Sequence, residues 1–377
     1  MLNPNRIDFP TNYSFVLERI NAINPIKYAK TRNYINGDIT YLAPYISRGM
    51  ISVKQVLDAI LNKGYPLKVT EKLIQELAWR EYYQRVWQSK NNLIWDDLKQ
   101  IQPNFNHRDM PAALQKAQTG IEIIDHEIKS LYDLGYLHNH LRMYLASIAC
   151  NIGKAHWLQP SKWMYYHLLD GDIASNNCSW QWVAGAFSNK KYYCNQENIN
   201  KYTFSRQKAT FLDMSYEDLV NIPIPLPLKE TVSLQLGTNL PLTKFPTIDI
   251  TIPTLLYNSY NIDPLWRNNE EVNRVLLLEP SHFMNYPVSD NVIQFIIELS
   301  NNIKGIQVFT GEVEDIQELY AQIERPDKET IISKEHPAFN HYPGKKDPRE
   351  WMFPEVSDYY PSFFSYWKNC ERILNRC

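Results

Sequence analysis

The chain has 377 residues, of which 44% are hydrophobic and 21% charged, a composition that excludes a disordered protein and allows two domains with ordinary cores. No apolar run reaches the roughly 18 residues of a transmembrane helix, and the N-terminal residues lack a signal-peptide core, so we expect a cytoplasmic protein without membrane contact. The net charge is −2, but residues 1–205 carry 23 Lys and Arg against 17 Asp and Glu, and residues 206–377 carry 16 against 24. A basic half that could approach a polyanion and an acidic half favour two domains with different partners, and ordinary scatter of charge explains the difference equally well.

Residues 10–205 are predicted to be helical, because apolar side chains recur there at i, i+3, i+4 and i+7. The segment before Gly135 is amphipathic and stops at that glycine, which is typical of a helix that ends in a left-handed residue. The segments with this periodicity are 13–23, 51–63, 69–88, 119–135 and 137–154.

The second part of the chain begins with a proline-rich stretch and continues with alternating strands and helices. Residues 206–265 lack helical periodicity, so we expect an extended connector there. Beyond it, short apolar runs alternate with amphipathic segments at lengths typical of a small, mostly parallel sheet covered by helices. Strands are expected at 272–280, 305–311 and 328–335, and helices at 289–303, 313–324 and, in the aromatic tail, 357–374.

The chain has five cysteines, an odd number without the spacing of a metal site. We therefore predict reduced thiols and no bound metal. An iron–sulfur cluster is the alternative, but no Cys-x-x-Cys pair supports it. The cysteines are Cys150, Cys178, Cys194, Cys370 and Cys377.

The most informative stretch is LLDGDIASNNCSWQWVAG at residues 168–185. Two carboxylates, Asp170 and Asp172, precede two adjacent amides, and two indoles follow at Trp180 and Trp182. Indoles offer stacking faces, while carboxylates and amides hydrogen-bond the edges of flat rings. The stretch therefore indicates a site for a planar ring, although its acids and amides taken alone also suit a loop followed by a helix cap.

Four segments of the first half, taken in order, carry a resemblance to a known family. They are DITYLAPYISRGMIS at 38–52, ELAWREYY at 76–83, GIEIID leading to GYLHNHLRM within 120–143, and the stretch at 168–185. Together they resemble the flavin-binding helical domain of the DNA photolyase/cryptochrome family over about residues 9–205. In that family the helical domain follows an α/β antenna domain, whereas here it comes first.

The resemblance implies that the helical part binds FAD. Thr40 is similar to a phosphate-binding hydroxyl of the family, and taken alone it also suits a helix N-cap. Asp170 and Arg142 resemble the family's ion pair beside the isoalloxazine, and Asn176 resembles the residue that faces flavin N5. The implied cofactor-binding residues are Tyr28, Thr40, Leu42, Arg80, Arg142, Asp170, Gly171, Asp172 and Asn176.

The same resemblance implies a pocket for a flipped pyrimidine dimer. A flipped lesion loses its neighbours and needs new stacking faces, here Trp79 and Trp182, which judged singly also suit core packing. Asn139 and Met143 together resemble members that act on cyclobutane dimers, whereas His140 replaces an arginine usual in that class. The implied DNA-binding residues are Glu76, Trp79, Asn139, His140 and Trp182, and the implied catalytic residues include Glu76, Asn139 and Met143.

Trp180 and Trp157 resemble the first two members of the family's electron-transfer tryptophans, and we count both as catalytic. The third position, near Asn104 and Phe105, holds no tryptophan. The candidates to replace it are Trp87, Trp95, Trp163 or a tyrosine.

The resemblance implies a lyase that repairs cyclobutane pyrimidine dimers in damaged DNA with light, and we expect it to act as a monomer. The alternative is a cryptochrome-like photosensor or flavoprotein of the same fold without repair activity, and a helical scaffold that has lost its flavin is a third possibility. The expected fold is an all-helical FAD-binding domain followed by a small α/β domain. The expected boundaries are 1–205 for the helical catalytic domain, 206–265 for the connector and 266–377 for the α/β domain.

Overall fold

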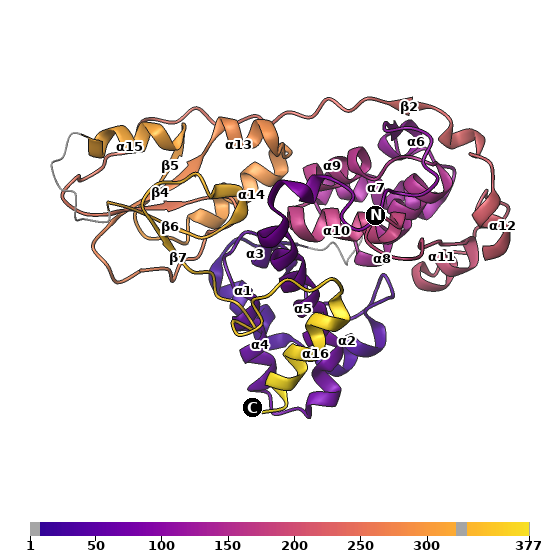
Figure 1. Cartoon of the computed structure of the whole chain (residues 1–377), viewed down its shortest axis with the longest axis horizontal. Coiled ribbons are helices and arrows are strands. Elements are labelled where there is room, and N and C mark those ends of the chain that lie inside the picture. The colour runs from indigo at the N-terminus through magenta and orange to yellow at the C-terminus, as the bar shows by residue number, and fades with distance from the viewer. Residues whose placement is uncertain (1–7, 322–329, 377) are drawn as a thin grey trace. The chain divides into compact units, whose positions relative to one another are not determined.

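The computed structural model describes residues 8–321 and 330–376, which form two compact units (Figure 1). Each unit is assembled from three separate stretches of the chain. Unit 1 consists of Met1–Ile23, Thr40–Gly64 and Gly237–Glu355, and unit 2 consists of Asn24–Ile39, Tyr65–Leu236 and Val356–Cys377. The chain therefore alternates between the two units instead of completing one before it starts the other.

Unit 2 is mainly helical, as the periodicity predicts. Its longest helix, α5 at Leu67–Lys90, contains no internal glycine or proline. The other helices are α2 (Pro25–Thr31), α6 (Ala112–Gln115), α7 (Glu122–Leu134), α8 (Asn139–Ser147), α9 (Leu158–His167), α10 (Ile173–Ala184), α11 (Gln196–Thr203), α12 (Tyr216–Asn221) and α16 (Phe363–Leu374). Single turns lie at Asn91–Trp95, Ile148–Ile152 and Leu226–Leu228, and β1 (Met110–Pro111) pairs with β2 (Thr231–Val232).

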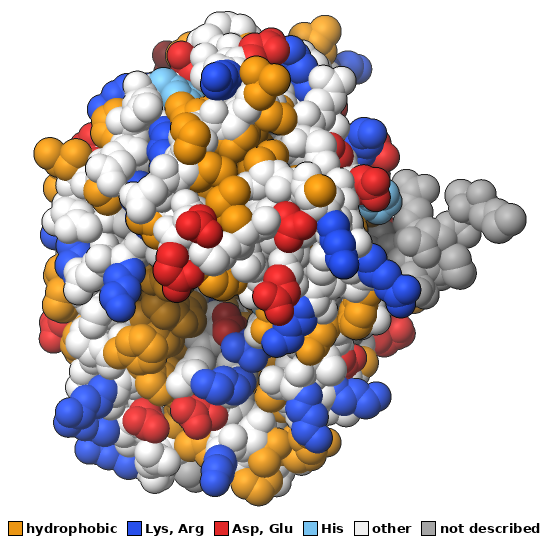
Figure 2. Space-filling view, turned by 90° about the vertical axis from the view of Figure 1, so that its right-hand side faces the viewer, with side chains coloured by type: hydrophobic (Ala, Val, Ile, Leu, Met, Phe, Trp, Pro, Cys, Tyr) orange, Lys and Arg blue, Asp and Glu red, His pale blue; other side chains and the backbone are white. Residues whose placement is uncertain are grey.

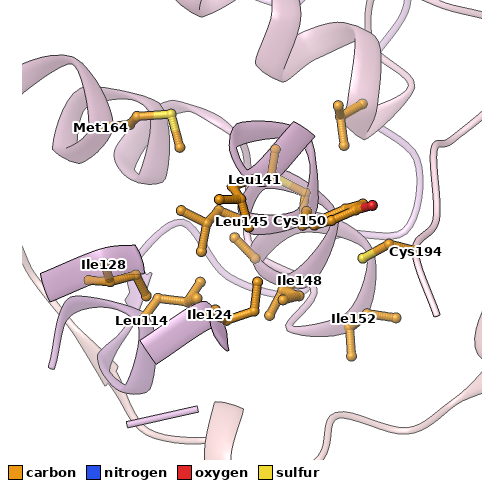
Figure 3. Packing of buried hydrophobic residues seen from close by; sticks show 14 of the residues in the cluster. Leu114, Ile124, Ile128, Leu141, Leu145, Ile148, Cys150, Ile152, Met164 and Cys194 are labelled. Carbon is orange, nitrogen blue, oxygen red and sulfur yellow. The ribbon is translucent and has the colours of Figure 1, made fainter. Parts of the chain in front are cut away.

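The core of unit 2 is an apolar cluster to which α6 to α10 contribute. Figure 3 shows Ile124 and Ile128 of α7 in the same cluster as Leu141 and Leu145 of α8. The i, i+4 spacing of each pair places both side chains on one face of its helix, and all four are buried. Gly135 ends α7 with a φ of 64°, which confirms the predicted left-handed terminus.

Unit 1 contains a sheet of five described strands in the order β5-β4-β3-β6-β7, and each neighbouring pair is parallel. This sheet confirms the predicted α/β part. The strands are β3 (Thr254–Tyr257), β4 (Asn273–Leu278), β5 (Ile306–Thr310), β6 (Ile331–Lys334) and β7 (Lys345–Asp347). The helices of unit 1 are α1 (Tyr13–Ala22), α3 (Ala43–Ser47), α4 (Val53–Leu61), α13 (Pro280–Asn285), α14 (Asp290–Ser300) and α15 (Val313–Ala321), and a 3₁₀ turn spans Pro337–Phe339.

Two strands of this sheet were missed by the sequence prediction. The central strand β3 and the helix α12 both lie inside the stretch 206–265, so the expectation of an extended connector over that whole stretch is wrong at these two points. The four residues of β3 are fully buried, but a run of four between prolines carries no periodic signal. β7 has the sequence KKD and lies at a sheet edge, where short charged strands are common. Residues 322–324 of the expected helix and 328–329 of the expected strand lie outside the described residues.

The N-terminal helices α1, α3 and α4 belong to unit 1, although the resemblance assigns them to the helical domain. Gly49 shows how tightly this stretch meets the segment after β3. Its φ is 64°, and a Cβ there would lie 2.3 Å from the Tyr260 carbonyl oxygen. Next to it, the Ile262 N–H donates to the Arg48 carbonyl oxygen at 2.9 Å. The boundaries at 205 and 265 follow resemblance and composition rather than these contacts, and they remain a proposal.

The thiols of Cys150, Cys178, Cys194 and Cys370 are free and buried, whereas Cys377 lies outside the described residues. Across residues 8–321 and 330–376, no group of three or more His, Cys, Asp or Glu side chains could hold a metal ion. In the same part of the chain, no helix has both the length and the apolarity that a bilayer crossing requires.

Candidate functional site

The candidate site in unit 2 centres on an ion pair between Arg142 of α8 and Asp170, which lies between α9 and α10. The Nη2 atom of Arg142 lies 2.9 Å from the Asp170 carboxylate, and its Nε atom donates to the Leu137 carbonyl oxygen at 2.8 Å. The Asp170 side chain is only 5% exposed, so the guanidinium compensates a charge that has lost most of its water. The structure thus brings together the two residues that the resemblance paired.

Asp172 begins α10 and also fixes that helix to α5. Its Oδ1 atom caps the helix by accepting the Ser175 N–H at 2.7 Å. Its Oδ2 atom accepts a hydrogen bond from Gln84 Nε2 and lies 3.5 Å from Arg80 Nη2, and both partners belong to α5. A carboxylate that is 3% exposed is therefore surrounded by donors from two helices.

The residues around this carboxylate leave polar groups for a ligand. Asn176, one turn further on, donates from Nδ2 to the Ser161 carbonyl oxygen at 3.0 Å. A Cβ at Gly171 would lie 3.0 Å from both the Tyr165 and Leu168 carbonyl oxygens, so this close backbone approach suits glycine. The Ser175 hydroxyl is buried and has no hydrogen-bond partner among the described residues. Such a group costs about 1–3 kcal/mol, which a bound polar molecule would recover.

These side chains fit the FAD that the resemblance implies. An amide, a buried hydroxyl and a guanidinium–carboxylate pair supply donors and acceptors for the edge of a planar ring with alternating polar atoms. Tyr28 of α2 belongs to the same unit, and burial, reinforced by the Glu76 carboxylate, raises the pKa of its phenol and keeps the ring neutral.

Two expected cofactor residues, Thr40 and Leu42, belong to unit 1. Leu42 is the N-cap residue of α3 and is 1% exposed. Thr40 lies two residues earlier, and its Oγ1 atom accepts the Leu42 N–H at 3.4 Å. Thr40 is therefore not the helix N-cap that its residue type alone suggests.

The α5 helix carries the two residues expected to meet a lesion, Glu76 and Trp79. Their i, i+3 spacing places them on one face of the helix. The Nε atom of Arg32 donates to Glu76 Oε1 at 3.3 Å, and the Glu76 side chain is still 38% exposed. Burial raises the pKa of Glu76, and the Arg32 charge opposes that shift. The carboxylate is thus accessible to solvent while it is closely surrounded by protein atoms.

The two expected stacking rings have different surroundings. The Phe363 ring of α16 stacks on Trp79, with 3.7 Å between the ring centroids and 11° between the planes. Trp182 is 37% exposed, and its ring neighbour is Tyr192 at 6.0 Å. One face of Trp79 is therefore covered by a ring of the same protein, whereas Trp182 keeps part of its surface free.

On α8 the expected lesion residues differ in accessibility. Asn139 is exposed at the first position of the helix, and Met143 is partly buried against the apolar core. The Nδ1 atom of His140 lies 2.6 Å from the Asn33 carbonyl oxygen, and its ring is parallel to Tyr144 at 5.5 Å. Burial lowers the pKa of His140, and the Asn33 hydrogen bond only partly offsets this. His140 is thus a neutral, anchored ring rather than the cation of an arginine.

Both expected electron-transfer residues are buried in unit 2. Trp180 lies within α10 at 2% exposure, and Trp157 is the fully buried N-cap residue of α9. The Nε1 atom of Trp157 donates to Asp97 Oδ1 at 2.6 Å. Among the candidates for the third position, Trp163 is buried and donates from Nε1 to the Tyr132 hydroxyl at 3.0 Å.

Sequence reasoning missed three residues of the site: Arg32, Gln84 and Phe363. Gln84 had a usable signal, because it follows Arg80 by one helical turn and therefore shares a face of α5 with it. The aromatic tail was expected to cover a face, but no pattern pointed to Trp79 as the partner of Phe363. Arg32 carries no local signal at all.

The charges on one face of the molecule are mixed in sign. Figure 2 shows Lys and Arg side chains interspersed with Asp and Glu on that face, with hydrophobic side chains between them.

Comparisons with known proteins found relatives of the helical part of the chain. Residues 73–210 match the family model described as the FAD binding domain of DNA photolyase. A deoxyribodipyrimidine photo-lyase of Buchnera aphidicola subsp. Acyrthosiphon pisum is 28% identical over 238 residues, which are 59% of this chain and 49% of that protein. The Escherichia coli enzyme of the same name is 33% identical over 118 residues, 29% of this chain and 24% of its own length.

Solved structures of similar proteins include a cryptochrome of Synechocystis sp. PCC6803, with a TM-score of 0.48 and 22% identity over 52% of this chain and 44% of that one. A class III photolyase of Agrobacterium tumefaciens has a TM-score of 0.41 and 26% identity over 46% of this chain and 38% of that one. The chain spans about half the length of the curated relatives from Buchnera aphidicola. Residues 73–210, which include the Arg142–Asp170 pair and the start of α10, are thus similar to the FAD-binding part of the DNA photolyase/cryptochrome family, and this similarity supports FAD as the cofactor.

Proposed function

We propose that this protein repairs cyclobutane pyrimidine dimers in DNA with light. The observation that carries the proposal is the double use of α5. Glu76 and Trp79 lie on one face of this helix, and Arg80 and Gln84 hold Asp172 at the start of α10. A single rigid helix therefore joins the residues proposed for the lesion to those proposed for the cofactor, which would keep their separation constant.

The residues proposed to hold the flavin are polar and well fixed. Arg142 and Asp170 would orient its ring edge, and Asn176 would hydrogen-bond to it. Thr40 would contact a phosphate. Reduced FAD held by these residues would supply, on light absorption, the electron that splits the cyclobutane ring, and would take that electron back once the ring has opened. The protein's contribution is to hold these partners and to exclude water from a site with few exposed charges. The further residues in this proposal are Tyr28, Leu42, Arg80, Gly171 and Asp172.

The residues proposed for the lesion combine stacking with hydrogen bonding. Trp79 and Trp182 would stack on the flipped pyrimidines, since an unstacked base gains about 1–3 kcal/mol from an aromatic face. Glu76 and Asn139 would bind the polar base edges, and Met143 would supply a soft apolar contact. His140, being neutral, would position the strand without adding a positive charge.

Trp180 and Trp157 are proposed to supply electrons from the protein. Asp97 accepts the Trp157 N–H and is positioned to stabilise positive charge on that indole. Burial alone would raise the pKa of Asp97, but hydrogen bonds from His156, Gln102 and Trp157 lower it, so the carboxylate is ionised at neutral pH.

The test is direct. First, flavin is released from a sample of the purified protein and quantified. Then the reduced, flavin-loaded protein is illuminated together with an oligonucleotide that contains one cyclobutane dimer. We expect loss of the dimer under near-ultraviolet or blue light and none in darkness. A protein that carries flavin but leaves the dimer intact under light would contradict the repair function.

A light-sensing flavoprotein without repair activity is the second candidate, and one observation favours it. Phe363 covers one face of Trp79, so that face is not open to a lesion. In that case light would change the flavin spectrum of the protein, while damaged and undamaged oligonucleotides would bind equally. We further propose that the protein acts as a cytoplasmic monomer, which size-exclusion chromatography with light scattering would test.

A further inference from the structure

The ring of Phe363 is arranged against Trp79 as a flat ligand would be. Its centroid lies 3.7 Å from that of the indole, and the planes differ by 11°. The neighbours Tyr82 and Tyr83 lie at 6.0 and 5.3 Å and are strongly tilted toward the indole. Phe363 thus takes the parallel stacking position that a nucleobase prefers on an aromatic side chain.

The helix that carries Phe363 is firmly attached to α5. The Tyr366 hydroxyl donates to the buried Glu81 carboxylate at 2.8 Å, and the Tyr82 hydroxyl donates to the Tyr360 carbonyl oxygen at 3.1 Å. Trp367, Cys370 and Leu374 bury the rest of the apolar face of α16. The helix is therefore a fixed part of unit 2.

Phe363 lies at the end of α16, where helices fray most readily. It is the first residue of the helix, its side chain is 3% exposed, and the Ser362 side chain caps this first turn by accepting the Ser365 N–H at 3.3 Å. Exposing one phenyl ring costs about as much as a base gains by stacking on a tryptophan. Removing the whole helix would expose several large side chains at once, which stacking of one base cannot offset. The first turn can therefore yield while the rest of α16 stays in place.

We propose that Phe363 is an internal competitor for the stacking face of Trp79, and that a flipped pyrimidine ring binds there only by displacing it. This inference rests on the proposed repair function. An undamaged base gains too little to displace the ring, because leaving the duplex already costs it pairing and stacking. A dimer loses less on leaving the duplex and adds contacts to Glu76 and Asn139. Phe363 thereby determines specificity, because every base that stacks on Trp79 must first supply enough binding free energy to displace the phenyl ring.

The test compares affinities of the reduced, flavin-loaded protein in darkness for one oligonucleotide with and without a single dimer. We expect Phe363→Ala to bind both oligonucleotides about tenfold more tightly than the unchanged protein. Phe363→Leu keeps an apolar side chain at this position but cannot stack, and it should give a similar gain if the ring is the competitor. Phe364→Ala is the matched control, because Phe364 is 72% exposed and meets Trp79 only edge-on at 6.5 Å.

A second measurement follows the first turn of α16 directly. Addition of the dimer-containing oligonucleotide should speed amide hydrogen exchange at residues 363–366 and leave exchange at 370–374 unchanged. Melting temperatures of the variants identify any that fold poorly, and for those the exchange experiment on the unchanged protein decides.

The outcomes separate this inference from the repair function. If Phe363→Leu binds equally or more weakly while the unchanged protein repairs dimers, the proposed role of Phe363 is overturned and the repair function stands. If the variant binds both oligonucleotides more tightly but no protein loses dimers under light, the repair function is contradicted and the role of Phe363 as a competitor stands. Absence of any binding in all proteins overturns both.

Discussion

Asp172 combines two tasks in one carboxylate. One oxygen caps α10 and the other accepts Gln84 and faces Arg80, so helix start and site electrostatics depend on the same side chain. The sequence identified Asp170 and Asp172 as a functional pair, and the N-cap role was also considered from residue type. The spacing of Gln84 from Arg80 shows that they share a face of α5, but it does not show that Gln84 binds Asp172, because that contact joins helices far apart along the chain.

The Arg142–Asp170 pair gives the first prediction. Arg142→Met should lower the free energy of unfolding by about 3 kcal/mol or more, because it removes the guanidinium that compensates the buried Asp170 charge. Adding Asp170→Asn removes that charge, so the double variant should recover part of the loss. Urea unfolding monitored by circular dichroism measures both, and flavin absorbance per protein should fall in both.

The control is the exposed pair of Lys116 and Glu230, whose side chains are 47% and 71% exposed. Lys116→Met should change stability by no more than about 1 kcal/mol. An equally small effect of Arg142→Met would show that the buried pair is not compensating a desolvated charge.

His138 gives a pH prediction. Burial, with smaller effects from His140 and Arg142, lowers its pKa to about 4, below the ordinary value of 6.5. As the pH falls, the unfolded chain is protonated first, so stability is full above pH 6.5 and is lost between pH 6.5 and 4, by at most about 3 kcal/mol. His138→Asn keeps a side-chain acceptor at the start of α8, where the His138 ring accepts the His140 N–H.

We expect this variant to lose less stability than the unchanged protein between pH 7 and pH 5 in denaturant titrations. Parallel pH curves for the unchanged protein and His138→Asn would contradict the assignment.

At the level of elements, most of the predicted helices are those with one apolar face. The predicted segments correspond to α1, α4, α5, α7, α8, α14, α15 and α16. α5 is an exception, because residues 81–87 are all buried. α10 is different, because buried residues occur around much of its circumference, including Asn177 and Gln181. A helix without a polar face has no amphipathic period, so composition rather than spacing drew attention to it. β3 was not predicted for a similar reason, because all four of its side chains are buried and no alternation results.

The contact between α5 and α16 gives the element-scale prediction. Tyr366→Phe removes the donor to Glu81, whose carboxylate is 2% exposed, and should lower the free energy of unfolding by about 1–3 kcal/mol. Hydrogen exchange within α16 should rise with it. Tyr65→Phe, at a residue that is 38% exposed, is the control and should change stability by less than about 0.5 kcal/mol. Equal effects of the two substitutions would mean that the Glu81 contact does not hold the helix.

At the scale of the whole molecule, the sequence predicted both kinds of architecture but not their interleaving. Periodicity describes each stretch alone, whereas membership in a unit depends on contacts between residues hundreds of positions apart. The segment Thr40–Gly64 resembles part of a helical domain and yet belongs to the unit that contains the sheet. The helical domain could be recognised because its motifs are local. That its first helices α1, α3 and α4 belong to the unit with the sheet could not be predicted, because it depends on contacts between distant residues.

Gly49 provides a test of this interleaving. Gly49→Ala should lower the free energy of unfolding by about 2 kcal/mol or more, because a left-handed alanine is strained and its Cβ would meet the Tyr260 carbonyl oxygen. Gly64→Ala has a similar φ of 70° but nothing within 4 Å, so it should show the backbone strain alone, about 1–2 kcal/mol. Thermal unfolding of both variants measures the difference. If Gly49→Ala is no more destabilised than Gly64→Ala, the approach of the two segments is looser than the structure describes.

The alternation of the chain has a consequence for cleavage. The backbone passes from one unit to the other five times, at the junctions after residues 23, 39, 64, 236 and 355. A protease that cuts at any one junction therefore severs the polypeptide without releasing a complete unit, since each fragment retains stretches that complete a unit with the other. Nicked protein should migrate as two bands in denaturing electrophoresis and still elute as one species under native conditions.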